Sequence, residues 1–135
     1  MSKYARPGWI VAHLYNPLLL RFRRAPGLAV RGRQSGEWHV VPVWPLELEG
    51  ERYLVAPRGE THWVRNLRVT GEGELRWGSR AEPFTATEIP PGHRGRFVDA
   101  YLRAYGKRYG GYVGREFAEM PDPADHPVFR ISSKT

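Results

Sequence analysis

A short basic turn stands between an apolar run and an amphipathic segment near the middle of the chain. Residues 53–56 form an apolar run typical of a buried strand, and Arg58 and Gly59 follow it. Thr61 can cap a short helix whose apolar face includes Trp63. Free N–H groups at a helix N-terminus beside an arginine attract anions, most commonly phosphate. The turn is therefore a candidate phosphate site, although a solvated arginine in an ordinary turn explains it as well.

A second basic turn, residues 32–36, closes a predicted β-hairpin. Alternation along the strand before it places Arg31 and Arg33 on one face, and Ser35 follows within the turn. The planar fork of an arginine side chain suits the oxygen geometry of phosphate. We therefore expect phosphate contacts from Arg31 or Arg33, from Ser35, and from the Arg58 side chain with the N–H of Gly59.

Pro42 interrupts the strand that is predicted to return from this hairpin over residues 37–43. Because proline cannot donate to a hydrogen-bonded ladder, the position requires an edge strand or a bulge. A flat ligand edge can lie where the ladder is interrupted, although an edge strand alone explains the proline. Trp38, Trp44 and Trp77 alternate with apolar residues, which favours burial and argues against a nucleic-acid-binding face.

Four tyrosines gather near a glycine pair in the C-terminal part of the chain. Tyr101 and Tyr105 are one helical turn apart, which is typical of core residues. Tyr109 and Tyr112 flank the glycines at 110–111. They are the better candidates for a lid, in which a phenol can stack on a flat acceptor or supply a proton.

Several kinds of active site find no support in the sequence. The five histidines form no i, i+4 pair and no HExxH motif, and cysteine is absent, so no metal site is expected. Neither GxSxG nor GxGxxG is present, which gives no support for a hydrolase or a Rossmann nucleotide site. If the protein is an enzyme, a cofactor can supply the chemistry.

Length and composition indicate one domain over residues 1–135, since 41% of the residues are hydrophobic and no linker or repeat interrupts the chain. The net charge of +7 favours a polyanionic partner, although an arginine-rich composition accounts for it equally. Residues 1–24 are expected to form an N-terminal helical segment that covers the core, and peripheral membrane contact through Trp9 is the alternative. The lack of cysteine suits a cytoplasmic location.

The order and spacing of four motifs resemble those of the deazaflavin-dependent nitroreductase family. They are the turn Gly32-Arg33-Gln34-Ser35-Gly36, the strand residue Pro42, the turn Arg58-Gly59, and the helix Trp63-Val64-Arg65-Asn66-Leu67. The resemblance covers residues 28–89. It implies an α+β fold, a split β-barrel of about six mainly antiparallel strands with an N-terminal helix, one inserted helix and a C-terminal helical pair.

The family resemblance also implies a function. Its members bind coenzyme F420, an 8-hydroxy-5-deazaflavin with a phosphate and a glutamate tail, and pass hydride to nitro compounds, quinones or other conjugated acceptors. With the two basic turns, the positions expected to contact the cofactor are Arg31, Arg33, Gln34, Ser35, His39, Pro42, Trp44, Val55, Ala56, Pro57, Arg58, Gly59, Trp63 and Asn66. Pro42, Trp44 and residues 55–56 are expected near the deazaflavin ring, and Asn66 is expected to contact the ligand only because of the resemblance.

The chain departs from the family pattern at several positions. Gln34 replaces a lysine of the first turn, His39 an arginine, Pro57 a serine and Arg58 a lysine. The cofactor can therefore be held by fewer cations than in the family. A track of basic residues for a long anionic tail is still predicted, which favours F420 over FMN. Its members are Arg31, Arg33, Arg58, Arg65 and Arg68.

Three interpretations are open at this point. The first is an F420-dependent oxidoreductase with a small conjugated or nitro-bearing acceptor. The second is a non-catalytic protein, or one that binds FMN or haem, with the same barrel. The third, which the tryptophan pattern disfavours, is a nucleic-acid-binding β-domain. The sequence assigns neither the native substrate nor the oligomeric state.

Overall fold

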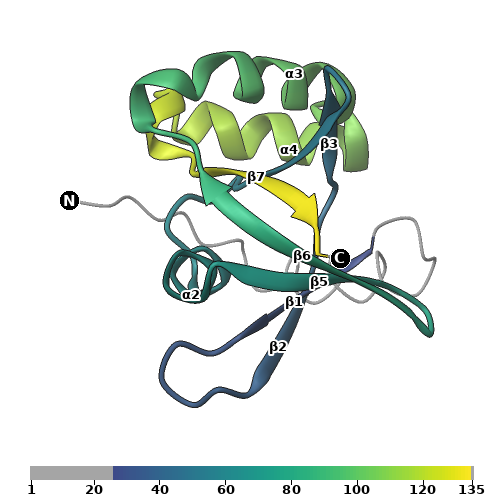
Figure 1. The fold of residues 1–135 in the computed structure, drawn as a ribbon. Coiled ribbons are helices and arrows are strands. Elements are labelled where there is room, and N and C mark those ends of the chain that lie inside the picture. The colour runs from purple at the N-terminus through teal and green to yellow at the C-terminus, as the bar shows by residue number, and fades with distance from the viewer. Residues whose placement is uncertain (1–25, 135) are drawn as a thin grey trace.

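The computed structural model describes residues 26–134, apart from the side chain of Tyr109. The helical segment predicted over residues 1–24 lies outside these described residues. Within them, the chain forms one curled antiparallel sheet with helices packed against it, an open half-barrel (Figure 1). The predicted α+β fold class is confirmed.

The sheet of the described residues contains seven strands in the order β2-β1-β5-β6-β7-β4-β3, and all neighbours are antiparallel. The strands are β1 (Gly27–Arg31), β2 (Trp38–Pro42), β3 (Leu46–Leu48), β4 (Glu51–Val55), β5 (Glu72–Trp77), β6 (Arg80–Glu88) and β7 (Val128–Ser133). The number is slightly higher than predicted because β3 is a separate strand that pairs with β4.

Three helices lie in the described part of the chain, with short 3₁₀ turns at Pro91–His93 and Pro123–Asp125. The inserted helix is α2 (His62–Thr70), and the C-terminal pair is α3 (Gly95–Tyr105) and α4 (Arg108–Glu119). Helix α2 packs on β1 and β5, whereas α3 packs on α4, β3 and β4 (Figure 1). None of these helices is long and apolar enough to cross a membrane.

Two separate apolar clusters hold the helices on the sheet. The cluster under α2 includes Leu28, Leu54, Val64, Leu67 and Phe129. The cluster under α3 and α4 includes Tyr53, Phe97, Tyr101, Val113 and Phe117. Since each large apolar side chain that leaves water contributes roughly 1.5–3 kcal/mol, these clusters fix the positions of all three helices.

Pro42 lies on β2, which forms one edge of the sheet, as its missing N–H requires. The expectation that Trp38 is buried is wrong, since Trp38 is 38% exposed. Arginines cover its ring in place of the core: the guanidinium carbons of Arg31 and Arg76 lie 4.3 and 4.9 Å from the ring centroid. Trp44 is buried as expected.

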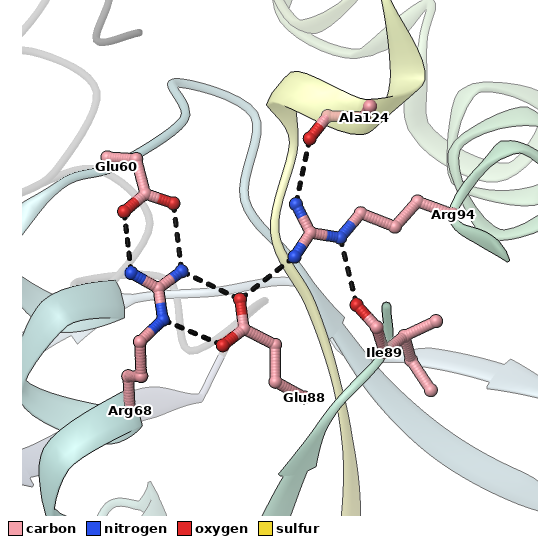
Figure 2. A network of polar contacts seen from close by, with 6 residues as sticks. All are labelled: Glu60, Arg68, Glu88, Ile89, Arg94 and Ala124. Atoms are coloured by element: carbon pink, nitrogen blue, oxygen red, sulfur yellow. Dashed lines mark hydrogen bonds and ion pairs between the residues drawn. The ribbon is translucent and has the colours of Figure 1, made fainter. Parts of the chain in front are cut away.

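A buried arginine joins the end of β6, the start of α3 and the turn Pro123–Asp125 (Figure 2). Arg94 is 5% exposed. It donates to the carbonyl oxygens of Ile89 and Ala124 at 3.0 and 2.8 Å, and to the Glu88 carboxylate at 2.9 Å. Every partner of this guanidinium is an oxygen, so its burial is compensated by hydrogen bonds.

Arg68 of α2 joins the same network from the other side. Its guanidinium donates twice to Glu60 and twice to Glu88, at 2.7 to 2.9 Å (Figure 2). The hydrogen bonds from Arg68 hold the pKa of Glu60 below its ordinary value. Because two carboxylates already engage Arg68, it is not available for the predicted anionic-tail track.

Candidate functional site

A cleft of about 490 Å³ opens between the turn that joins β1 to β2 and the helix α2. We call it the outer cleft. Its lining residues are Val30, Gly32, Arg33, Gln34, Ser35, His39, Val40, Val41, His62, Trp63 and Asn66. None of these residues is acidic, and Arg33 carries a positive charge, so the cleft favours an anionic ligand. Its volume is typical of small-molecule sites, which measure roughly 300–1,000 Å³.

Asn66 fastens the turn of the outer cleft to α2. Its side-chain oxygen accepts one hydrogen bond from the backbone N–H of Arg33 at 3.1 Å and one from the Arg33 guanidinium at 2.7 Å. Asn66 is only 4% exposed, so these bonds satisfy an oxygen that would be costly to bury unpaired. The guanidinium has five N–H donors, so it keeps donors for an anion while Asn66 orients it.

Glycines shape the same turn. A Cβ atom on Gly32 would lie 2.8 Å from the Ser35 Oγ and 3.0 Å from the His39 Nε2, so a larger residue would displace both polar groups. Gly36 has a φ of 74°, the left-handed conformation that glycine adopts easily. The Ser35 Oγ accepts a hydrogen bond from the Glu37 N–H at 3.2 Å. The turn sequence therefore brings a hydroxyl and an imidazole together beside the Arg33 cation.

A second, smaller cavity of about 50 Å³ adjoins the outer cleft. We call it the inner cavity. It is lined by Val41, Pro42, Val43, Trp44, Val55, Pro57, Arg58, Thr61, Trp63, Tyr101 and Glu116. Val41 and Trp63 line both spaces. A cavity of this volume holds a few water molecules or one polar substituent, not a ring system.

A buried carboxyl group lines the inner cavity. Glu116 of α4 is 8% exposed. The Arg58 Nε lies 3.9 Å from its Oε2, and the Tyr112 hydroxyl is hydrogen-bonded to it. Burial raises the pKa of Glu116 to about 7, although Arg58 and the Tyr112 hydrogen bond act in the opposite direction. Burial also raises the pKa of Tyr112 to about 12. Near neutral pH, therefore, Glu116 can exchange a proton while Tyr112 keeps its own.

Two buried polar atoms of the inner cavity's lining residues have no hydrogen-bond partner among residues 26–134. They are the Trp44 Nε1 and the Thr61 Oγ1, on residues that are 8% and 6% exposed. Thr61 occupies the N-cap position of α2 as predicted, but its hydroxyl makes no capping hydrogen bond. Since an unsatisfied buried polar atom costs roughly 1–3 kcal/mol, the pair indicates a ligand or water with hydrogen-bonding groups.

His126 connects α4 with the end of β4. It is fully buried, and its Nδ1 and Nε2 lie 2.9 and 2.6 Å from the carbonyl oxygens of Ala56 and Met120. Its ring stacks on Phe117, with the ring centroids 4.2 Å apart. These contacts fix the last turn of α4 relative to β4, and they thereby position Glu116 at the inner cavity.

The structure divides most of the predicted cofactor residues between the two spaces. The outer cleft brings together Arg33, Gln34, Ser35, His39, Trp63 and Asn66, and the inner cavity brings together Pro42, Trp44, Val55, Pro57, Arg58 and Trp63. The two basic turns therefore line different spaces. Of the residues expected near the deazaflavin ring, Pro42, Trp44 and Val55 line the inner cavity, which has no room for a ring in this structure.

Three of the predicted residues, Arg31, Ala56 and Gly59, are outside both sets of lining residues. Arg31 covers the Trp38 ring and donates to the carbonyl oxygen of Gly36 at 2.9 Å. The Ala56 carbonyl accepts the N–H of Gly59 at 3.4 Å. That N–H is therefore already used inside the turn.

The sequence analysis missed Glu116. Its spacing could have revealed it. Glu116 lies three residues after Val113 and four after Tyr112, so it shares the apolar face of α4. His62, which lines the outer cleft, was missed as well. Of the two predicted lid tyrosines, Tyr112 contacts Glu116. Tyr109 lies in α4, with its side chain outside the described residues.

No family model and no curated protein matches the chain. An F420-H2-dependent reductase of known structure is 24% identical, with a TM-score of 0.56 over 79% of this chain and 92% of that one. HutZ, the heme storage protein from Vibrio cholerae, is 14% identical, with a TM-score of 0.52 over 88% and 89%. A conserved hypothetical protein from Mycobacterium tuberculosis is 16% identical, with a TM-score of 0.54 over 100% and 85%. These likenesses confirm the split-barrel fold.

Proposed function

We propose that this protein is an oxidoreductase that binds coenzyme F420 in the outer cleft and passes hydride to a conjugated, quinone-like or nitro-bearing acceptor. The observation that carries the proposal is the composition of the outer cleft. A cation that Asn66 orients, a serine hydroxyl and an aromatic wall meet in about 490 Å³, and none of the lining residues among 26–134 is acidic. These groups fit a flat ligand that carries a phosphate.

Each part of the outer cleft has a role in this proposal. Arg33 and Ser35 bind the phosphate, and Gln34 offers an amide beside them. Trp63 packs against the flat ring, and because it lines both spaces, it places the ring beside the inner cavity. When bound, the reduced deazaflavin supplies the hydride. The protein contributes proximity and orientation, which are the main requirements of such a transfer.

Haem or FMN binding is the second candidate function. Two imidazoles, those of His39 and His62, line the outer cleft, and imidazole is a common haem ligand. The fold is shared with a heme storage protein as well as with an F420-H2-dependent reductase. FMN ends at its phosphate, so one cation such as Arg33 suffices to hold it.

Equilibrium titrations of the purified full-length protein with F420, FMN and haem test the choice. The proposal predicts that F420 binds most tightly and that the reduced coenzyme is oxidised when a quinone or nitroaromatic compound is added. If haem bound most tightly, and if His39→Ala or His62→Ala abolished that binding, haem binding would be the function supported. Binding of none of the three would overturn both candidates.

A further inference from the structure

The proposed function leaves the inner cavity unused. The buried carboxyl of Glu116 lines it, with the Arg58 Nε at 3.9 Å. Independently of this pair, the Trp44 Nε1 and the Thr61 Oγ1 are buried without partners in the described part of the chain. The first is a donor, and the second can donate. Together they indicate a small guest that accepts hydrogen bonds, since only about 50 Å³ is free.

We propose that the inner cavity takes the carbonyl oxygen of a quinone-like acceptor, and that Glu116 is the catalytic acid that protonates this oxygen. The proposal rests on the proposed function, because it needs the reduced deazaflavin as the hydride donor. The cavity admits the carbonyl oxygen, while the acceptor's ring, to which the carbonyl carbon belongs, stays in the outer cleft beside Trp63. The Trp44 N–H and the Thr61 hydroxyl then hydrogen-bond the same oxygen.

The step balances with these partners. The acceptor takes a hydride, two electrons and one proton, onto its second oxygen as a C–H bond of the reduced deazaflavin breaks, and negative charge develops on the carbonyl oxygen in the inner cavity. The O–H bond of the Glu116 carboxyl breaks, and a new O–H bond forms on the acceptor oxygen. Glu116 is left as a carboxylate that the Arg58 charge stabilises. Solvent returns the proton after the hydroquinone leaves.

The surroundings of Glu116 favour an acid over a permanent ion pair. A buried ion pair is stable only with close, hydrogen-bonded geometry, whereas the Arg58 Nε lies 3.9 Å from the carboxyl. Within residues 26–134, the other titratable groups nearby are Tyr112 and Glu119 on α4, and Tyr101 of α3 at the same cavity. The negative charge of Glu119 opposes ionisation of Glu116. Burial outweighs the effects of Arg58 and the Tyr112 hydrogen bond, so Glu116 stays protonated up to about pH 7.

Single-turnover reduction of a quinone by reduced F420 tests the proposal. Glu116→Gln is expected to lower the rate about 100-fold or more, the size of a general-acid contribution, with F420 affinity unchanged. Glu116→Asp should restore part of the rate, and Asp99→Asn, which changes an exposed carboxylate on α3, should leave it unchanged. The wild-type rate should fall above about pH 7, and this fall should be absent from Glu116→Gln. An unchanged rate and pH profile in Glu116→Gln would overturn the proposal.

A measurement without cofactor separates this proposal from the proposed function. Infrared difference spectra against Glu116→Gln isolate the protonated carboxyl band of Glu116. The band should disappear as the pH rises through about 7, and at a higher pH in Tyr112→Phe, which loses a bond that favours the carboxylate. Normal turnover with no such band at pH 6 would remove this proposal alone. A wild type that neither binds nor oxidises reduced F420 would remove the proposed function, and this proposal with it.

Discussion

The side-chain oxygen of Asn66 accepts two hydrogen bonds from Arg33, one from the backbone N–H at 3.1 Å and one from the guanidinium at 2.7 Å. The first residue lies in α2 and the second in the turn after β1. One amide oxygen therefore fixes both the backbone of the turn and the direction of its cation. The position of the positive charge in the outer cleft depends on the helix as much as on the hairpin.

Arg33→Gln is expected to weaken F420 binding roughly 10- to 100-fold, since a hydrogen bond to a charged group contributes about 1.5–3 kcal/mol. Arg103→Gln removes the same charge from an exposed position on α3 and should change the affinity by no more than about twofold. Fluorescence titration measures both. Equal weakening by the two variants would show that net charge, and not the Arg33 contact, holds the coenzyme.

The sequence predicted the parts of the fold that depend on local chemistry. Pro42 required an edge strand or a bulge because its missing N–H is a property of the residue itself, and β2 is an edge strand. The spacing of Tyr101 and Tyr105 by one helical turn is also a local property, and both residues lie in α3. The motif at residues 32–36 likewise predicted a turn with a cation, which the outer cleft contains.

The sequence could not predict which distant segments meet. Glu116 lines a cavity with Arg58 because α4 is fixed over β4, partly by the two carbonyl contacts of His126. Alternation around Trp38 showed that the two faces of β2 differ, but not which of them the core would cover. The sequence analysis treated Arg68 as a free cation, whereas the fold places the carboxylates of Glu60 and Glu88 in hydrogen-bonding contact with it.

Two carboxyl groups are expected to give the folding stability opposite pH dependences. Burial raises the pKa of Glu116 to about 7, so its contribution is fully present below its ordinary pKa and is lost as the pH rises through about 7. Hydrogen bonds from Arg68 lower the pKa of Glu60, so its contribution is present above its ordinary pKa and is lost as the pH falls below it.

Urea unfolding at pH 5 and pH 8 measures the first effect. Ionisation of Glu116 should cost the wild type up to about 3 kcal/mol across this range. Glu116→Gln should not show this loss, because the glutamine side chain stays neutral at both values. Asp99→Asn, which changes an exposed carboxylate on α3, serves as the control and should follow the wild type. Parallel profiles for Glu116→Gln and the wild type would show that Glu116 is ionised throughout.

Arg94→Ala is expected to lower the free energy of unfolding by roughly 3–5 kcal/mol, the usual cost of breaking a buried charged network. Arg94→Lys should restore little of this, because an ammonium group cannot reach three oxygens with the planar fork of the guanidinium (Figure 2). Urea unfolding gives the comparison. Arg96→Ala, which removes an exposed ion pair with Glu49, should cost no more than about 1 kcal/mol. A similarly small cost for Arg94→Ala would mean that the hydrogen bonds from Arg68 alone are sufficient to stabilise the Glu88 carboxylate.

The basic track predicted for a long anionic tail is shorter in the structure than in the sequence. Arg31 covers the Trp38 ring, Arg58 lines the inner cavity, and Arg68 is bound by two carboxylates. Of the predicted members, Arg33 lines the outer cleft, and Arg65 is exposed on the adjoining helix. Since Arg33 would bind the phosphate of either cofactor, Arg65 alone among the predicted members is left to distinguish the proposed F420 from FMN.

F420 is expected to bind more tightly than FMN at low salt, with a margin that shrinks as the salt concentration rises. Both cofactors place one phosphate at Arg33, so only the glutamate tail distinguishes them, and its charges meet an exposed cation. Exposed charges are damped beyond roughly 8–10 Å at physiological ionic strength. Titrations of both cofactors at low and high salt, repeated with Arg65→Gln, measure the effect. If the tail runs along α2, the variant should lose the salt-dependent margin and keep FMN affinity unchanged. Tighter binding of FMN at both salt concentrations would assign the protein to flavin binding and remove the F420 proposal.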